Sequence, residues 1–444
     1  MNVSDAVDAV LPSVVDDLAA LVAIPSVSAL PTHAGYVQQS AEWVVAQIRA
    51  LGCDDVRIVT EGGQPAVIAR FPGPVGAPTV CLYAHHDVQP TGDVALWTSD
   101  PFAVREADGR LFGRGVADDK AGVMVHLAAL RAFGGKPPVG VTLFVEGEEE
   151  IGSASLATIL ERHRDLLAAD AYVIADSGNW NVGEPAFTTT LRGLVDCVVE
   201  VSTLDHALHS GQYGGAVPDA LTALCRLLAT LHDADGNVAI EGLSAMPDPE
   251  LDYPESRLRA ESGALDGVRL LGEGPIAGRL WTKPTATVIG IDATSVADAS
   301  NTLAPSARAK VSVRIAPDAD PGQALAALTT HLQQHAPWGA RVRVSDGTKG
   351  SGTTVPFQGP FADAARAAFV EAWGVEPVFT GQGGSIPMVA DFQQAFPAAE
   401  IVVTAVCDPD SRMHGIDESL HLGDFAKACK AEALLLARLA GEAG

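Results

Sequence analysis

The sequence predicts an α/β fold: a mostly parallel sheet covered by helices on both faces, with an inserted two-layer α+β domain. Over the first 190 residues, short apolar runs alternate with helical patterns, which is typical of a parallel sheet with crossover helices. From about residue 191 the order changes to strand, helix, strand, strand, helix, strand, which indicates a small βαββαβ domain. At 444 residues, the chain is also long enough for two domains of unequal size.

The first part of the chain contains both kinds of pattern in turn. Helical spacing of apolar residues is found in VDDLAALVAI, YVQQSAEWVVAQIRAL and KAGVMVHLAALRAF. Between these segments, the runs PTVCLYAHHD, VGVTLFVEGEEE and AYVIAD predict buried strands. Each of these runs ends on polar side chains, and open α/β sheets place their sites at strand ends.

The second part predicts strands in LRGLVDCVVEVS, TATVIGID, ARAKVSVRIA and ARVRVS, and helices in PDALTALCRLLATL and QALAALTTHLQQH. The stretch 234–284, rich in Pro, Gly and acidic residues, is expected to be a long insertion in this domain. After GTKGSGTT the α/β alternation resumes. We therefore expect a discontinuous catalytic domain (1–190 and 351–444) and an inserted domain (191–350).

Composition excludes several classes of function. The chain has 29 Lys+Arg and 55 Asp+Glu, for a formal net charge of −26, which repels nucleic acids and anionic membrane surfaces. No apolar stretch approaches the length of a membrane helix, and the N-terminus lacks the pattern of a signal peptide. Six scattered cysteines without a CxxC pair indicate reduced thiols that fill the core. A cytoplasmic location is expected.

Residue types that bind metals follow several predicted strands. In YAHHDVQP, His85 and Asp87 come directly after an apolar run, and a carboxylate often orients a ligating imidazole. His86 points to the other side of the strand and is expected to be a neighbour. By itself, this pattern is equally consistent with a solvated strand end.

Two acidic segments lie nearby in the sequence. Asp118 and Asp119 precede a predicted helix, where carboxylates also serve as simple caps. Glu148, Glu149 and Glu150 follow a strand, and their mutual repulsion is tolerable in water or beside a cation. Adjacent carboxylates also allow one to bind a metal while its neighbour acts as a base towards water.

The last two segments complete the candidate set. Asp176 ends the run YVIAD, and His414 lies in CDPDSRMHGIDES, with His421 as a weaker alternative ligand. Two imidazoles and at least three carboxylates fit a binuclear zinc site. The competing interpretation is an acidic α/β protein whose carboxylates are solvated caps and turn residues.

These segments resemble a family of zinc-dependent exopeptidases. It includes carnosinase, cytosolic non-specific dipeptidase, carboxypeptidase G, aminoacylase, acetylornithine deacetylase and succinyl-diaminopimelate desuccinylase. The resemblance covers nearly the whole chain through HxD, GRGxxDDKxG, EGxEExGS, a strand-end Asp, LHSGxYGG, NTLxP, GGSIP and a late His. Chance agreement of all eight features is implausible.

The resemblance implies two divalent metal ions in each subunit, most simply Zn, with Mn or Co as alternatives. One ion would be bound by His85 and Asp176, the other by Glu150 and His414, and Asp118 would bridge them.

The resemblance also implies that the peptide bond between Asp118 and Asp119 is cis. Glu149 would be the general base and later the general acid for water activated by the two metal ions, and Asp87 would orient His85.

For the inserted domain, the resemblance implies a homodimer. His209, in LHSGQYGG, would reach the scissile carbonyl bound by the other subunit, and Asn301 or Thr302, in NTLAP, would be a second contribution from that partner.

A substrate-carboxylate site is implied as well. Arg314 in VSVRIAP, together with Gly384 and Ser385 in GGSIP, resembles the residues that bind it. Gly381 and Gln382 stand where animal dipeptidases carry Arg and Glu, so the side-chain preference does not transfer. GIDES after His414 also departs from the usual small residue, Pro, Asn and Glu.

The function predicted on this basis is hydrolysis of the amide bond of dipeptides. Within the family, HHDVQP and ADDK favour a dipeptidase, whereas deacylases of N-acyl amino acids more often read HxDVVP. A catalytically silent peptide-binding relative is the remote alternative. Because Glu149, the implied general base, is present, an active enzyme is preferred over a silent relative.

Overall fold

The computed structural model describes residues 2–384 and 387–441. The chain divides into two compact units. The first unit comprises Met1–Thr189, Val355–Thr380 and Met388–Gly444, and the inserted unit comprises Thr190–Thr354 and Gly381–Pro387.

The first unit is built on a six-stranded sheet with the order β1-β2-β6-β3-β7-β17. Strands β6, β3, β7 and β17 run parallel to one another, whereas β2 is antiparallel to both β1 and β6. The predicted α/β fold with a mostly parallel sheet is therefore confirmed, and antiparallel pairing is found at the edge formed by β1 and β2. The strands are β1 (Val56–Val59), β2 (Ala66–Phe71), β3 (Thr79–His85), β6 (Gly140–Glu146), β7 (Ala171–Ile174) and β17 (Glu400–Val403).

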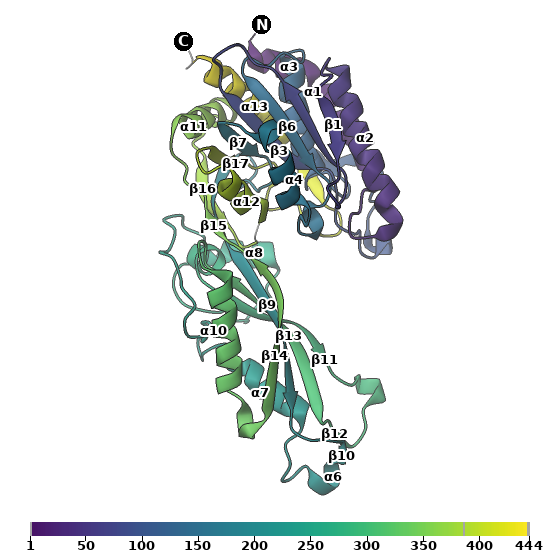
Figure 1. Cartoon of the computed structure of the whole chain (residues 1–444), viewed down its shortest axis with the longest axis vertical. Helices are drawn as coiled ribbons and strands as arrows, with labels where there is room; N and C mark the ends of the chain where they lie inside the picture. The colour runs from purple at the N-terminus through teal and green to yellow at the C-terminus, as the bar shows by residue number, and fades with distance from the viewer. Residues whose placement is uncertain (1, 385–386, 442–444) are drawn as a thin grey trace. The chain divides into compact units, whose positions relative to one another are not determined.

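Helices cover both faces of this sheet because successive strand residues point in opposite directions (Figure 1). On one face, Leu82 and Leu143 belong to a large aliphatic core. That core is formed with α1 (Val3–Val22), α2 (Ala34–Ala50), α3 (Lys120–Ala132), α11 (Pro360–Trp373) and α13 (Leu422–Gly441).

The opposite face is aromatic. Phe392 of α12 (Pro387–Ala395) packs against Tyr83, Phe144 and Tyr172, with ring centroids 4.6–6.1 Å apart. Helix α5 (Arg164–Leu167) contacts β2 and β6, and it follows α4 (Leu156–Arg162). The central strands are therefore buried on both sides, as continuous apolar runs require.

A small antiparallel sheet in the first unit connects distant parts of the sequence. It has the order β18-β5-β4. Its strands are β4 (Arg105–Ala107), β5 (Arg110–Phe112) and β18 (Ser419–His421). Because β18 pairs with β5, the segment that carries His414 lies next to the segment that carries Asp118.

A further three-stranded sheet is formed by β8 (Ala186–Leu191), β15 (Thr353–Thr354) and β16 (Val378–Gln382).

The inserted unit has the predicted βαββαβ order. Its four-stranded sheet, β11-β13-β9-β14, is antiparallel throughout. Helices α7 and α10 pack on the sheet and share an aliphatic core with it (Figure 1). The elements are β9 (Gly193–Ser202), α7 (Ala220–Ala229), β11 (Thr285–Asp292), β13 (Ser306–Ile315), α10 (Pro321–Gln334) and β14 (Arg341–Gly350).

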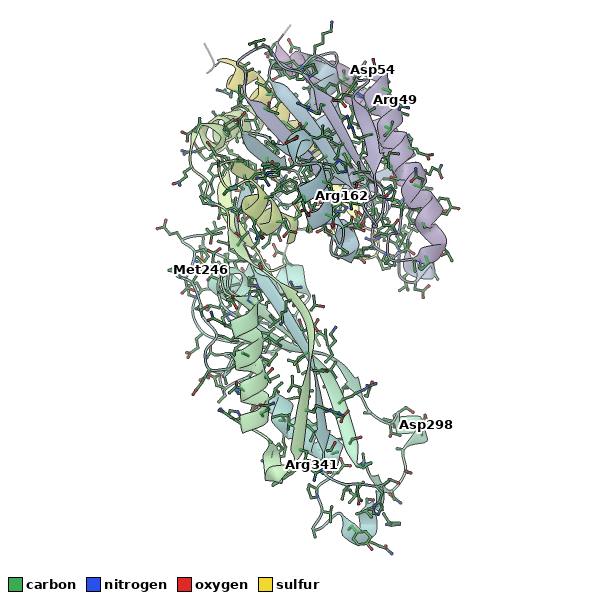
Figure 2. All side chains as sticks on the ribbon, in the orientation of Figure 1. Arg49, Asp54, Arg162, Met246, Asp298 and Arg341 are labelled. Carbon is green, nitrogen blue, oxygen red and sulfur yellow. The ribbon has the colours of Figure 1, made fainter. Side chains whose placement is uncertain are left out.

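Shorter elements complete the inserted unit. Strands β10 (Leu208–His209) and β12 (Thr302–Leu303) pair with each other, and α6 (Ser210–Tyr213) follows β10 directly. The predicted insertion contains α8 (Glu255–Ser262) and α9 (Ile276–Trp281). Asp298 lies on the loop that follows β11 (Figure 2).

One expectation about the cysteines is wrong. Five of the six are buried, but Cys225 is exposed. It lies on α7, whose buried stripe is formed by Ala220, Ala223, Leu224 and Leu227, and position 225 falls outside this helical stripe. None of the six cysteines, all of which lie in the described part of the chain, forms a disulfide. Within that same part, no helix combines the length and apolar character needed to cross a membrane.

Candidate metal centre

The carboxyl ends of the central parallel strands bring the predicted site residues of the first unit together. β3 ends at His85, which is in register with Glu146 at the end of β6, and β7 ends at Ile174, two residues before Asp176. Since parallel strands end at the same edge of a sheet, the segments that follow them meet there. This explains why ligand-type residues that are distant in sequence are neighbours in space.

Two groups of three side chains could each hold a metal ion, and Asp118 belongs to both. In one group, the Nε2 atom of His85 lies 3.2 Å from Oδ1 of Asp118 and 4.0 Å from Oδ2 of Asp176. In the other group, the Nε2 atom of His414 lies 3.0 Å from Oδ2 of Asp118 and 3.2 Å from Oε2 of Glu150. Each oxygen of Asp118 therefore faces a different imidazole.

The donor set fits a pair of divalent ions. Within each group, the candidate ligand atoms lie within 4.8 Å of one another. Imidazole nitrogen and carboxylate oxygen are the ligands that zinc and related metals accept. The concentration of negative charge in these groups is the kind that a divalent cation neutralises.

His85 is held so that one ring nitrogen faces the ligand group. Its Nδ1 atom lies 3.0 Å from the carbonyl oxygen of Asp87 and 3.4 Å from Oδ1 of the same residue. A proton on Nδ1 therefore has acceptors, and Nε2 is the ring nitrogen that faces Asp118. Burial lowers the pKa of His85, but Asp118 and Asp87 outweigh that effect and raise the pKa well above its ordinary value.

Asp87 also fixes the turn that carries two of the acids. Its carboxylate accepts hydrogen bonds from the backbone N–H groups of Glu149 (3.3 Å) and Glu150 (3.2 Å). These residues form a short 3-10 turn, Glu149–Ile151. One buried carboxylate thereby couples the position of His85 to that of the acidic turn.

The three consecutive glutamates differ in their surroundings. The carboxylate of Glu148 accepts hydrogen bonds from the backbone of Gln64 (2.9 Å) and Ser155 (2.6 Å), so it organises neighbouring loops. Glu150 faces His414. Burial raises the pKa of Glu149 to about 7, and the nearby carboxylates act in the same direction against His85. Such a value suits a general base that works near neutral pH.

The remaining ligand candidates have shifted proton affinities too. Asp118 and Glu150 raise the pKa of His414 to about 10. Burial and the charge of Asp119 hold the pKa of Asp176 well above its ordinary value. A cluster of titratable groups with shifted pKa values is typical of a functional site.

Asp119 has a different task from Asp118. Its Oδ2 atom accepts the backbone N–H of His85 at 3.1 Å, and the peptide bond that joins Asp118 to Asp119 is cis. A Cβ atom at Gly122 would approach Oδ1 of Asp119 to 2.4 Å and the carbonyl oxygen of Ala175 to 2.7 Å. Helix α3 therefore needs glycine here to lie so close to the end of β7.

Sequence reasoning did not assign roles to three residues around the centre. Gln89 donates its backbone N–H to Oε1 of Glu150 (3.1 Å) and its side-chain amide to Oε2 (2.8 Å), so it binds both oxygens of that carboxylate. Arg114 and Glu418 form a buried ion pair at 2.6 Å. Arg114 lies in the motif GRGxxDDKxG, Gln89 in the segment YAHHDVQP and Glu418 in the segment CDPDSRMHGIDES. Such patterns do not show which side chains contact each other.

The predicted site residues of the inserted unit do not all lie together. His209 pairs with Thr302 across two short strands, and Ser210 donates its backbone N–H to the carbonyl of Asn301, so these residues form one exposed cluster. Arg314 lies near the C-terminal end of β13, whereas Asn301 and Thr302 precede its N-terminal end. Burial lowers the pKa of Arg314.

The GGSIP segment is described only in part. Gly384 is exposed, and Ser385 lies outside the described residues.

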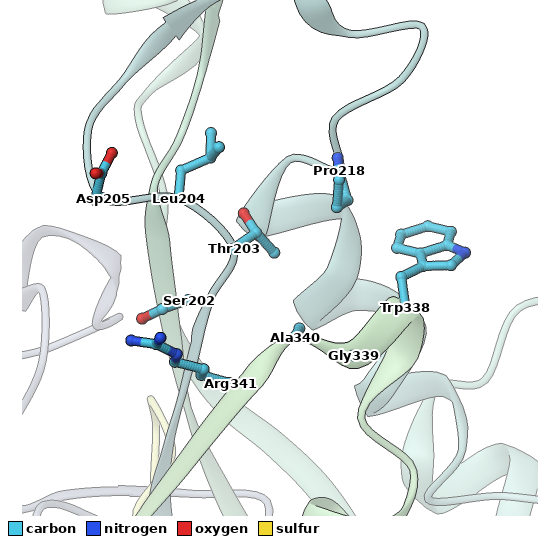
Figure 3. A pocket seen from close by; sticks show the side chains of 9 residues that line it. All are labelled: Ser202, Thr203, Leu204, Asp205, Pro218, Trp338, Gly339, Ala340 and Arg341. Atoms are coloured by element: carbon cyan, nitrogen blue, oxygen red, sulfur yellow. The ribbon is translucent and has the colours of Figure 1, made fainter.

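A surface hollow in the inserted unit is separate from all the predicted site residues. It has a volume of about 450 Å³, and Trp338, Arg341 and Asp205 are on its wall (Figure 3). No residue predicted to bind metal or substrate lines it.

The fold and the ligand groups define the class of protein: a metal-dependent hydrolase with an α/β sheet. The chain belongs to Peptidase family M20/M25/M40, whose sequence profile matches residues 81–438. It is therefore a hydrolase of peptide bonds that uses divalent metal ions.

Relatives and solved structures agree with this assignment. The chain is 36% identical over 432 residues to the cysteinylglycine-S-conjugate dipeptidase of Corynebacterium striatum, covering 95% of this chain and 94% of that protein. It is 28% identical to the Cys-Gly metallodipeptidase DUG1 of Saccharomyces cerevisiae, covering 98% and 97%.

Among solved structures, the di-peptidase Dug1p of Saccharomyces cerevisiae has a TM-score of 0.84 at 25% identity, covering 99% of this chain and 98% of that chain. Human carnosine dipeptidase 1 has a TM-score of 0.83 at 25% identity, with the same coverage.

Proposed function

We propose that the protein is a dipeptidase that hydrolyses the amide bond of dipeptides, with Glu149 as general base. The observation that carries the proposal is the position of Asp118, which presents one oxygen to each of two ligand groups. The dipeptidase relatives support the choice of substrate class.

In this proposal, His85 and Asp176 would hold one metal ion, Glu150 and His414 would hold the other, and Asp118 would serve both. The bound ions supply Lewis acidity, which makes water a better nucleophile and polarises the scissile carbonyl. Zinc is our first choice because nitrogen and oxygen ligands suit it, and manganese and cobalt are the alternatives.

Glu149 performs the proton transfers. As an ionised carboxylate, it accepts the proton of the attacking water, and it then donates that proton to the leaving amine. Its pKa, raised by burial to about 7, makes both steps accessible near neutral pH. Asp87 keeps the Nδ1–H of His85 engaged and holds the turn that carries Glu149.

The inserted unit contributes through a homodimer. Arg314 lies near the C-terminal end of β13, whereas Thr302 of β12 precedes the N-terminal end of that strand. The eight residue steps of β13 from Ser306 to Arg314 alone span roughly 26 Å at about 3.3 Å per residue. A dipeptide is far shorter than that distance. If both Arg314 and the His209 cluster act on substrate, they serve different active sites, which favours a crossed arrangement between two subunits.

The edge of the inserted sheet supports association. β11 is one of the two edge strands of this sheet, and its apolar side chains Val288, Ile289 and Ile291 are 40–55% exposed. An unpaired apolar strand edge favours pairing with another chain. In the proposed dimer, the inserted unit is the dimerisation and lid domain, and the first unit is catalytic.

The His209 cluster and Arg314 have separate tasks in this dimer. His209 donates to the developing oxyanion in the partner's site, with Asn301 and Thr302 beside it. Arg314, with Gly384 and Ser385, binds the substrate carboxylate. Six cysteines without a disulfide, all in the described residues, favour the cytoplasm as the place of action.

A substrate panel on the reconstituted enzyme tests this function. The chelated protein is reloaded separately with Zn²⁺, Mn²⁺ or Co²⁺ and assayed with dipeptides, tripeptides and N-acyl amino acids. We expect dipeptides to have the highest kcat/KM. Preferential hydrolysis of N-acyl amino acids would identify a deacylase, and binding of peptides without turnover would identify a silent relative.

A further inference from the structure

The side chain of Glu418 is fully buried and accepts four hydrogen bonds next to the metal centre. Its Oε1 atom accepts the backbone N–H groups of Ala117 (3.0 Å) and Asp118 (3.1 Å). Its Oε2 atom accepts the backbone N–H of Gly115 (3.0 Å) and Nη1 of Arg114 (2.6 Å). This carboxylate therefore fixes the backbone of the turn that presents Asp118.

The partner of Glu418 extends this connection to two other segments. The Nη2 atom of Arg114 donates to the carbonyl of Pro90 at 3.3 Å and to that of Gly415 at 3.1 Å. Pro90 follows the segment that carries His85, and Gly415 follows His414. The guanidinium also lies over the ring of Trp97, 5.4 Å from its centroid, which shields it from water.

The pair thus joins three chain segments, each of which supplies a ligand. We propose that Arg114 and Glu418 are positioning residues that set the distance of His414 and Asp118 from each other and from His85. The inference rests on the proposed metal site. It assigns a function to two residues that contact neither substrate nor metal.

The chemistry of the Arg114–Glu418 pair suits the positioning of ligand residues better than a purely stabilising role. A buried ion pair is costly to desolvate, and an apolar pair of similar volume is often as stabilising. What charge adds is directional hydrogen bonding to fixed backbone groups. Glu418 and Arg114 direct these bonds at the backbone of one ligand residue, Asp118, and at Gly415, the neighbour of another.

A matched control exists in the same part of the fold. Arg110 and Asp408 form an ion pair at 2.8 Å, with the carboxylate buried, between β5 and the segment that precedes His414. Arg110 also donates to Ser419 (2.9 Å). The recorded hydrogen bonds of this pair do not involve the backbone of a proposed ligand.

The test compares Glu418→Gln and Arg114→Lys with Asp408→Asn in the full-length protein. Gln retains one acceptor oxygen but places an amide N–H₂ against two of the four donors. Lys retains the charge but cannot reach both carbonyls. Zn²⁺ affinity is measured by competition with a chromophoric chelator, the visible spectrum is recorded after loading with Co²⁺, and thermal unfolding is measured in excess chelator.

We expect Glu418→Gln and Arg114→Lys to weaken Zn²⁺ binding by 10- to 100-fold, the typical effect of losing a group that orients a ligand. Their Co²⁺ spectra should differ from that of the wild type, whereas Asp408→Asn should keep the wild-type affinity and spectrum. If all three variants lose thermal stability but none changes in affinity or spectrum, the pair is structural and the proposal is wrong.

Two further outcomes are decisive. If Glu418→Gln does not fold, Arg114→Lys decides, because it preserves charge and most of the volume; wild-type affinity in that variant overturns the proposal. If the wild type itself binds no divalent ion, the proposed function fails. If the wild type binds two ions and the substitutions at Arg114 and Glu418 leave its affinity unchanged, only the positioning proposal fails.

Discussion

The imidazole of His414 and the carboxylate of Asp118 lie 3.0 Å apart, although they come from distant parts of the chain. Asp118 is almost fully buried, whereas the side chain of His414 is 55% exposed and its backbone has a positive φ of 62°. The proposed centre therefore joins a buried candidate ligand to a candidate ligand that lies on an exposed loop. This asymmetry makes the variants of the individual ligands informative.

Glu149→Gln should keep both metal ions and lose nearly all turnover. The amide preserves the shape of the side chain but cannot accept the proton of water, and general base catalysis is typically worth about 10²–10⁴-fold. Elemental analysis and kcat are measured on the same preparation. Full metal content with activity within about tenfold of the wild type would reject Glu149 as the base.

Asp118→Ala should lose metal from both positions, whereas Asp176→Ala should mainly weaken one. The reason is that Asp118 faces both imidazoles, while Asp176 belongs to one ligand group. Titration of the metal-free variants with Zn²⁺, followed by calorimetry, gives the number of sites. Loss of a single site in both variants would contradict the bridging role.

His209→Ala should lower kcat with unchanged metal content, because loss of one oxyanion donor typically costs about 10²–10³-fold. Mixing this variant with Glu149→Gln tests the crossed dimer. One site of the mixed dimer has an intact base and the partner's intact histidine, so activity should return from two nearly inactive proteins. With subunit exchange verified, no return of activity would rule out crossed sites.

Glu146→Gln should make the metal-free protein more stable at high pH. Burial raises the pKa of Glu146 from 4.5 to about 8, with further contributions from Asp87 and Glu149 against the hydrogen bond donated by Tyr83 at 2.7 Å. The folded pKa is higher than the unfolded pKa. The stabilising contribution is therefore complete below about pH 4.5 and is lost as the pH rises to about 8.

Urea unfolding in excess chelator measures this effect. Wild type and Glu146→Gln should have similar stability near pH 5, and the variant should be more stable at pH 8.5 by a few kcal/mol. The same substitution at Glu161, which is exposed on α4, serves as control and should change neither value. Parallel pH profiles for wild type and Glu146→Gln would show that the carboxyl is already ionised in the folded protein.

Much of the fold could be predicted because its signals are local. The runs around Leu82, Leu143 and Val173 are long and apolar, and such runs indicate strands that are buried on both faces. The candidate ligands could be proposed because parallel strands end at one edge. The expectation of a buried Cys225 is wrong because the residue lies outside the apolar stripe of α7, which the scatter of the cysteines does not show.

What the sequence could not predict depends on contacts between distant segments. Glu148 and Glu150 are close in sequence and of the same type, yet one binds backbone N–H groups and the other faces His414. The hydrogen bonds from Gln89 to Glu150 and the pairing of Arg114 with Glu418 depend on how loops pack. Neither hydrophobic periodicity nor residue spacing predicts these contacts.

The pairing of β18 with β5 has a consequence for the order in which the protein matures. A nascent chain that has emerged only as far as α11 already contains Asp118, Glu150 and Asp176, but it lacks β17 and the segment with His414. Domains usually fold as units, and this one is completed by its C-terminal segments. We therefore expect the proposed centre to be complete, and able to bind both ions, only late in biosynthesis.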